Sequence, residues 1–155
     1  MIRIAGRRLR PATRDEVLES AAQYLTTELR GTTLDTPRAS HEYLRQLLRS
    51  YEHEIFGAIF LDNRHRVIEA RQLFRGTIDG ASVHPREVVK TALALNAAAL
   101  ILYHNHPSGI AEPSQADELI TRRLNEALAL VDIRILDHVI VAGDATLSFA
   151  EKGLL

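Results

Sequence analysis

The spacing of apolar side chains predicts two amphipathic helices in the first third of the chain. In residues 15–29, apolar positions recur at intervals of three and four, with acidic residues in the first turn. Thr36 followed by Pro37 is typical of a helix cap with proline at the first helical position, and the apolar side chains of residues 43–48 then form one stripe. We therefore expect a helix in each segment.

The pattern changes in the middle of the chain to short apolar runs, which are typical of strands. Residues 54–62 and 66–76 flank a polar turn and predict an antiparallel hairpin. Pro85 begins another helix with a broad apolar face. Residues 97–103 are apolar without alternation, and we expect them to form a strand that is covered on both faces.

The last third of the chain predicts one long helix and two strands. Ser114 begins a helical pattern that continues through residue 131, residues 133–143 read as a strand, and residues 143–149 supply a short final one. Helices and strands are mixed along the chain. The fold class that this order favours is α/β, with a mixed β-sheet flanked by helices.

Length, charge and cysteine content narrow the function. A chain of 155 residues, 46% of them hydrophobic, has the usual size of one domain with its own core. The formal net charge of -1 gives no support to a protein that coats nucleic acid, so DNA is a partner that composition does not favour. Because the chain has no cysteine, a bound metal must have nitrogen and oxygen ligands.

The beginning of the chain is rich in arginine and has no acid before Asp15. The arginines are Arg3, Arg7, Arg8, Arg10 and Arg14. Such a cluster can contact an anionic partner, but without interleaved aromatic residues we interpret residues 1–34 as a solvated or docked arm followed by the first helix. The sequence shows neither the apolar core of a signal peptide nor a membrane-spanning run, so we expect a cytoplasmic protein without membrane contact.

The candidate chemistry follows the predicted strand at residues 97–103. Residues two apart at a strand end point to the same side, so His104 and His106 can present two imidazoles to one point. Pro107 and a nearby glycine turn the chain into a loop that returns at the next helix, where Asp117 can supply a carboxylate oxygen. Three protein ligands and one open position are typical of catalytic zinc, whereas structural zinc has four protein ligands.

Each part of this pattern also has an ordinary structural explanation. Ser114 and Asp117 form an S-x-x-D capping box, and histidines are often buried polar groups with a partner. The Ser114 hydroxyl can cap the helix or stabilise an oxyanion, two roles that compete for one atom. Because the histidine pair, the turn and the carboxylate occur together, we favour a metal site that activates a hydrolytic water.

The segment HNHPSGIAEPSQAD resembles the JAMM (MPN+, or JAB domain) metalloprotease signature H-x-H-x(7)-S-x(2)-D. The surrounding VHPREVVKTALALNAAALILYHNHPSG and ILDHVIV are similar to the RadC branch of that superfamily, over residues 35–155. The resemblance implies a cytidine-deaminase-like, JAMM-type three-layer α/β sandwich. It also implies one zinc ion per chain, bound by His104, His106 and Asp117, with Ser114 beside the oxyanion.

The resemblance further implies a glutamate on an early strand, often within E-x-x-G, that takes a proton from the zinc-bound water. Glu54 and Gly57 match that spacing. Glu52 lies two residues away and shares a face with Glu54 if the strand begins early, so the choice stays open, although the glycine favours Glu54.

Two further pairs of residues have alternative interpretations. Asp137 and His138 can orient a ligand histidine from behind, or make the ordinary hydrogen bonds of a strand end. Arg86 and Glu87 can form an ion pair at a helix start or contact a substrate. The sequence does not separate these alternatives.

The function that we expect is that of a zinc-dependent hydrolase of the metallopeptidase or isopeptidase type, acting on a peptide or protein. The alternative is a DNA-repair accessory or DNA-binding protein with a structural or vestigial metal site, because the RadC name is associated with DNA repair. Phosphoester hydrolysis is a poor match, since one metal with one carboxylate ligand differs from the paired-metal sites of nucleases. The sequence does not indicate the oligomeric state.

Overall fold

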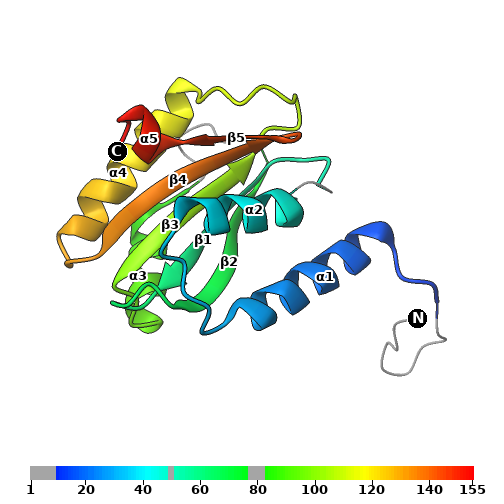
Figure 1. Ribbon diagram of the computed structural model, residues 1–155, viewed down its shortest axis with the longest axis horizontal. Coiled ribbons are helices and arrows are strands. Elements are labelled where there is room, and N and C mark those ends of the chain that lie inside the picture. Colours follow the sequence, from blue (N-terminus) through cyan, green and yellow to red (C-terminus); the bar gives the residue numbers. More distant parts are fainter. Residues whose placement is uncertain (1–9, 49–50, 77–82) are drawn as a thin grey trace.

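The computed structural model describes residues 10–48, 51–76 and 83–155, with a five-stranded sheet at its centre (Figure 1). The strand order is β2-β1-β3-β4-β5. The strands are β1 (Ile55–Leu61), β2 (Val67–Arg75), β3 (Ala99–Asn105), β4 (Arg134–Ala142) and β5 (Ala145–Ser148). Strands β3 and β4 are parallel and every other neighbouring pair is antiparallel, so the sheet is mixed.

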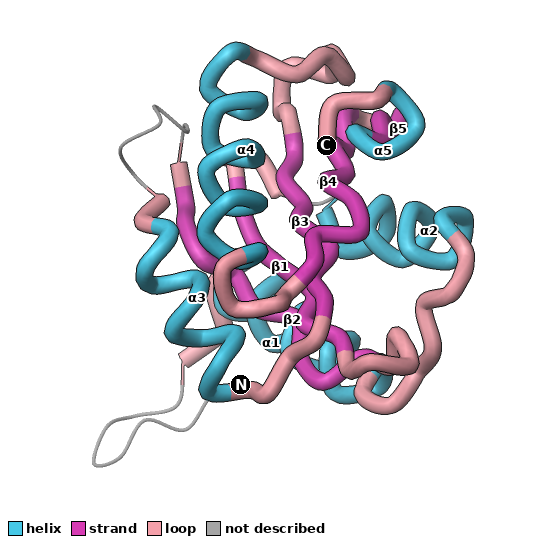
Figure 2. Tube along the Cα trace, turned by 90° about the vertical axis from the view of Figure 1, so that its left-hand side faces the viewer, coloured by secondary structure: helices cyan, strands magenta, loops and turns pink. Residues whose placement is uncertain are grey.

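Helices cover both faces of this sheet, which gives three layers. They are α1 (Arg14–Leu29), α2 (Pro37–Leu48), α3 (Pro85–Ala94), α4 (Gln115–Ala129) and the short α5 (Phe149–Lys152). Figure 2 shows α3 and α4 on one side of the sheet and α2 on the other. The predicted α/β class, with a mixed sheet flanked by helices, is confirmed.

The two central strands β1 and β3 are buried at every position, because each contributes to two apolar cores. Leu100 and Leu102 of β3 belong to the core under α3 and α4. Ile101 and Tyr103 belong to the core under α2. A strand covered on both faces is what the absence of alternation predicted. Each large aliphatic side chain buried in this way contributes about 1.5–3 kcal/mol.

Strand β3 lies two residues further along the chain than the apolar run indicates. Asn96 has a positive φ of 53°, and the Ala97 N–H donates to Ala92 O at 2.9 Å, so helix α3 is still being terminated where the strand was expected to begin. At the other end, pairing with β1 and β4 continues through polar residues. His104 and Asn105 are therefore strand residues and not the first loop residues.

A close approach between β1 and β3 requires glycine at position 57. A Cβ atom there would overlap the ring and hydroxyl of Tyr103 and would lie 2.7 Å from the carbonyl oxygen of Arg71 on β2. Gly57 thus has a packing function in the strand that begins directly after Glu54.

The predicted arginine-rich arm is described only in part. Arg3, Arg7 and Arg8 lie outside the described residues. Arg10 pairs with Glu16 at 2.5 Å, and Arg14 pairs with Glu52. Among the described helices, none has the length and apolar character needed to cross a membrane.

Candidate metal centre

Three potential metal ligands meet at one end of the sheet. His104 is on β3, His106 follows that strand, and Asp117 is in the first turn of α4. His104 Nε2 lies 2.8 Å from His106 Nε2 and 3.3 Å from Asp117 Oδ1, and His106 Nε2 lies 3.2 Å from Asp117 Oδ2. His104 and Asp117 are buried and His106 is half-buried. One ligand atom from each residue therefore faces a common point.

Strand pairing and a tight turn position the two histidines. His104 lies opposite Phe56 of β1 in the antiparallel register. The His106 N–H donates to Val141 O of β4 at 2.8 Å, so this residue is still attached to the sheet. Gly109 has a φ of 80°, and its N–H donates to His106 O at 3.1 Å. The left-handed conformation, which glycine adopts without strain, turns the loop back towards α4.

A capping box positions Asp117. The Ser114 hydroxyl accepts a hydrogen bond from the Asp117 N–H at 3.1 Å, and Asp117 Oδ2 accepts one from the Ser114 N–H at 2.8 Å. The capping interpretation of Ser114 is therefore correct. The same carboxylate caps the helix and faces the histidines, so the start of α4 determines where the oxygen ligand lies.

The carboxylate of Asp117 is ionised at neutral pH. Burial raises the pKa of Asp117, but the neighbouring His104 and His106 imidazoles and the Ser114 N–H together lower it well below its usual range. The hydrogen bond with Asp117 raises the pKa of His106 against the opposing effect of burial. The centre thus combines a buried negative charge with two imidazoles and favours a cation.

Glu54 directly precedes β1, whose Phe56 lies opposite His104. The charge of Glu54 is the smallest of the causes that raise the pKa of His106. Its side chain is half-buried.

Glu52 is engaged elsewhere. Its carboxylate pairs with Arg14 of α1, and its side chain is 76% exposed. It also borders the cavity beside His106, but its charge is not among the causes of the shifted histidine pKa. Of the two glutamates that the sequence left open, Glu54 is the one whose charge contributes to the raised pKa of His106, and its role as a base stays a prediction.

Asn105 is a buried residue beside the centre that the sequence analysis did not single out. Its buried side chain accepts a hydrogen bond from Ile55 N–H at 2.7 Å and donates to His53 O at 2.9 Å. These two backbone groups flank Glu54. Asn105 therefore fixes the backbone on both sides of the glutamate, and the available signal was a polar residue between two histidines at the end of an apolar strand.

Of the two interpretations of Asp137 and His138, contact with a ligand histidine applies to His138 and ordinary hydrogen bonding applies to Asp137. His138 Nε2 lies 2.7 Å from His104 Nδ1, so this ring contacts a candidate ligand from behind. Asp137 accepts hydrogen bonds from the Ser148 hydroxyl at 2.6 Å and from the Ala150 N–H at 3.0 Å. Asp137 makes the ordinary structural bonds, which attach the C-terminal segment to β4.

Of the two alternatives for Arg86 and Glu87, the structure shows the ion pair at the start of a helix. Their closest side-chain atoms are 3.8 Å apart, and the side chains are 83% and 61% exposed. An exposed pair of this kind contributes only about 0–1 kcal/mol.

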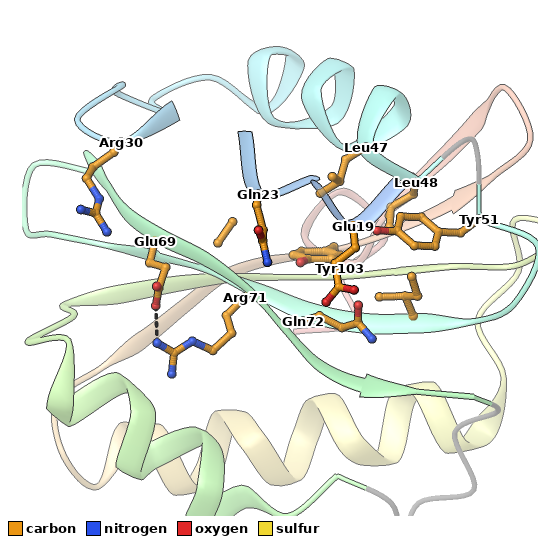
Figure 3. Close-up of a pocket in the computed structure, with 12 residues that line it drawn as sticks. Glu19, Gln23, Arg30, Leu47, Leu48, Tyr51, Glu69, Arg71, Gln72 and Tyr103 are labelled. Carbon is orange, nitrogen blue, oxygen red and sulfur yellow. Dashed lines mark hydrogen bonds and ion pairs between the residues drawn. The ribbon is translucent and has the colours of Figure 1, made fainter. Parts of the chain in front are cut away.

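Two cavities near the sheet differ in their relation to the centre. One of about 320 Å³ is lined by His106, Asn105 and Pro107 and by apolar groups from α2 and β4. Another of about 420 Å³ lies on the α2 face of the sheet, between α1, α2 and β2, and has Tyr103 at its floor and the Glu69–Arg71 pair along its wall (Figure 3). Only the first adjoins a candidate ligand.

The donor set of the candidate ligands fits zinc. Donor atoms about 2.0–2.1 Å from a tetrahedral zinc ion lie about 3.3 Å from one another. Each imidazole Nε2 lies at about this distance from one oxygen of Asp117, His104 at 3.3 Å from Oδ1 and His106 at 3.2 Å from Oδ2, whereas the two Nε2 atoms are closer, at 2.8 Å. Two imidazoles with an ionised carboxylate are a donor set that zinc commonly takes in catalytic sites. The described residues can therefore hold one such ion.

Curated relatives align with nearly all of the chain. A protein of Nitrosococcus oceani named UPF0758 protein is 64% identical over 139 residues, which are 89% of this chain and 62% of the relative. The UPF0758 protein of Vibrio cholerae is 60% identical over 140 residues, 90% of this chain and 88% of the relative. The chain thus spans about three fifths of the Nitrosococcus relative and most of the Vibrio one.

The family comparison covers the sheet, α2 to α4 and all the candidate ligands. A family model described as RadC-like JAB domain matches residues 34–154. The match begins after α1 and includes both histidines, Ser114 and Asp117. Together with the identities above, it shows that this chain belongs to the RadC-like JAB domain family.

Proposed function

We propose that this chain is a zinc-dependent hydrolase of the metallopeptidase or isopeptidase type. The observation that carries the proposal is the convergence of His104 Nε2, His106 Nε2 and the ionised Asp117 carboxylate at one point. Membership of the RadC-like JAB domain family supports the same reaction class. His104, His106 and Asp117 would hold one zinc ion.

Bound zinc supplies a Lewis acid that lowers the pKa of water and polarises a substrate carbonyl. Glu54 then takes a proton from the attacking water at its carboxylate and passes it to the leaving nitrogen. Asn105 keeps the backbone on both sides of Glu54 in place during both transfers. A carboxylate suits this function because it can accept and return one proton.

Ser114 can stabilise an oxyanion without giving up its cap. The cap uses a lone pair of the Ser114 oxygen, which accepts from the Asp117 N–H. A hydroxyl has two lone pairs and one proton, so its O–H can donate to an oxyanion while the cap stays intact. The competition between the two roles that the sequence analysis assumed is therefore removed.

The cavity beside His106 supports a peptide substrate. It has a volume of about 320 Å³ and combines apolar walls from Leu48, Tyr51 and Val141 with the polar side chain of Asn105. An extended peptide segment can place a side chain there while its carbonyl faces the metal centre. We found no feature of the described residues that favours the DNA-binding alternative.

Metal content and hydrolysis test the proposal together. Purified protein is expected to contain one zinc ion per chain, and His104→Ala and Asp117→Ala are expected to lose it. Glu54→Gln is expected to keep zinc and lose hydrolysis of a peptide library, whereas the control Glu126→Gln, at an exposed position of α4, keeps both. Zinc-loaded protein without peptidase activity, but with DNA binding at physiological salt that survives chelation, would instead support the accessory alternative.

A further inference from the structure

A buried row of hydrogen bonds continues from His104 into the interior of the protein. His104 Nδ1 lies 2.7 Å from His138 Nε2, and His138 Nδ1 lies 2.6 Å from the Thr121 hydroxyl. Thr121 in turn donates to the carbonyl oxygen of Asp117 at 2.7 Å. The row therefore connects two candidate metal ligands through two residues that contact no solvent, since His138 and Thr121 are 0% and 1% exposed.

The protons along this row can be assigned from its end. The Asp117 carbonyl oxygen can only accept, so the Thr121 hydroxyl donates its single proton there and offers a lone pair to His138. His138 then donates from Nδ1. The His138 ring is completely buried, and its two nitrogens face His104 and Thr121, neither of which carries a negative charge, so the ring is neutral and has one N–H. Its Nε2 is consequently an acceptor and receives the Nδ1 proton of His104.

The result is a His104 ring whose Nε2 has a lone pair and no proton. This atom is the one that faces His106 and Asp117. In His106 the same outcome has a different cause, because its Nδ1 lies 2.9 Å from the carbonyl oxygen of Ile110, which can only accept. In the form that binds a cation, both imidazoles thus present unprotonated Nε2 atoms to the point that the carboxylate also faces.

We propose that Thr121 is a positioning residue for zinc binding, which acts through His138 to hold His104 in the tautomer that ligates metal. The proposal rests on the metal site of the proposed function. Rings on both sides keep His138 in place: Phe149 stacks on it with centroids 4.5 Å apart, and Phe56 meets it edge-on at 5.7 Å. Because the His138 ring is held in place, what can still change is which of its nitrogens carries the proton. The Thr121 hydroxyl determines this.

Removing the Thr121 hydroxyl should reverse the direction of the hydrogen bond between His138 and His104. In Thr121→Val, a proton on His138 Nδ1 would be a buried N–H without an acceptor, which is more costly than an unused lone pair. His138 would therefore carry its proton on Nε2 and donate to His104 Nδ1. His104 would then carry its own proton on Nε2. The ring would have to change to the other tautomer before Nε2 could bind zinc.

The test measures zinc affinity and histidine tautomers separately. By competition with a chelator, Thr121→Val is expected to bind zinc about 10–100-fold more weakly than the unmodified protein, the range typical for groups that orient a metal ligand. Thr121→Ser keeps the hydroxyl and is expected to restore affinity to within about threefold. Thr91→Val, a threonine in α3, is the matched control and is expected to bind zinc as the unmodified protein does.

Nitrogen-15 spectra of the imidazoles in metal-free, unmodified protein are expected to show His104 and His138 protonated on Nδ1. Protonation of His104 on Nε2 in that sample would overturn the proposal, as would unchanged zinc affinity in Thr121→Val. If Thr121→Val does not fold, the nitrogen-15 spectra of the unmodified protein still test the proposal, because they show which nitrogen of His104 is protonated. Failure of zinc-loaded protein to hydrolyse peptides would overturn the proposed function and leave the tautomer result standing.

Discussion

Ser114 offers a substitution series that separates the folding of α4 from catalysis. The Ser114 oxygen caps the helix by accepting from the Asp117 N–H at 3.1 Å, and the proposed mechanism uses its O–H on the oxyanion. Ser114→Thr keeps both groups. Ser114→Ala removes both the cap and the O–H donor. Ser114→Gly also removes the hydroxyl, but glycine is a tolerated N-cap residue.

The expected stabilities follow from the cap. Replacing a serine N-cap by alanine costs about 1 kcal/mol, whereas glycine costs only a few tenths. For a chain of this length, 1 kcal/mol lowers the melting temperature by roughly 2–4 °C. Thermal unfolding of metal-free protein should therefore place the Thr variant with the unmodified protein, the Gly variant just below it and the Ala variant lowest.

The expected activities follow a different order. Loss of one oxyanion donor lowers kcat by about 10²–10³-fold. Because the Gly and Ala variants both lack the hydroxyl, zinc-loaded samples of both should lose kcat to a similar extent, while the Thr variant keeps most of it. If the Gly variant instead retained kcat within about threefold of the unmodified protein, the oxyanion role of Ser114 would be refuted and only the cap would remain.

Three further predictions concern β1, β3 and α1. Gly57→Ala should destabilise the fold by about 1–3 kcal/mol, because its Cβ overlaps the Tyr103 ring; chemical denaturation measures this, and a neutral effect would contradict the close approach. Asn105→Ala should keep zinc but lower kcat, since the backbone around Glu54 loses its clamp; unchanged kcat would exclude a positioning role. Glu16 has a pKa lowered to about 2 by its hydrogen bond with an arginine, so its stabilising effect is present above about pH 4.5 and lost as pH falls towards 2; the difference in melting temperature between the unmodified protein and Glu16→Gln should disappear over that range.

The sequence predicts the elements well because their signals are local. Pro37 and Ser114 begin their helices where the sequence places them, and the apolar run of β3 is buried on both faces. Helix α5 was not predicted, because it has only four residues. Its ends do carry local signals, since the Ser148 hydroxyl accepts from the Glu151 N–H at 3.1 Å in an S-x-x-E pattern and Gly153 has a φ of 69° at the C-cap. Asp137, eleven residues before Ser148, adds hydrogen bonds that the residues of the helix do not indicate.

The candidate site also contains residues that the sequence predicts and residues that it does not. His104, His106 and Asp117 stand within fourteen residues of one another, so a strand-end and helix-start pattern was enough to group them. Thr121 could not be found, because a threonine within a helix usually bonds to the preceding turn, as this one also does. Its contact with His138 exists only because β4 packs beside α4.

The stacking of Phe149 on His138 extends the site to the very end of the chain. Phe149 is fully buried, and the segment that carries it is anchored to β4 by Asp137. Deleting the final seven residues would remove no ligand and no base, yet it would open the back of the imidazole row to water. Purification tags should therefore not disturb the segment around Phe149. A loss of zinc affinity caused by such a disturbance could be mistaken for the loss of a metal ligand.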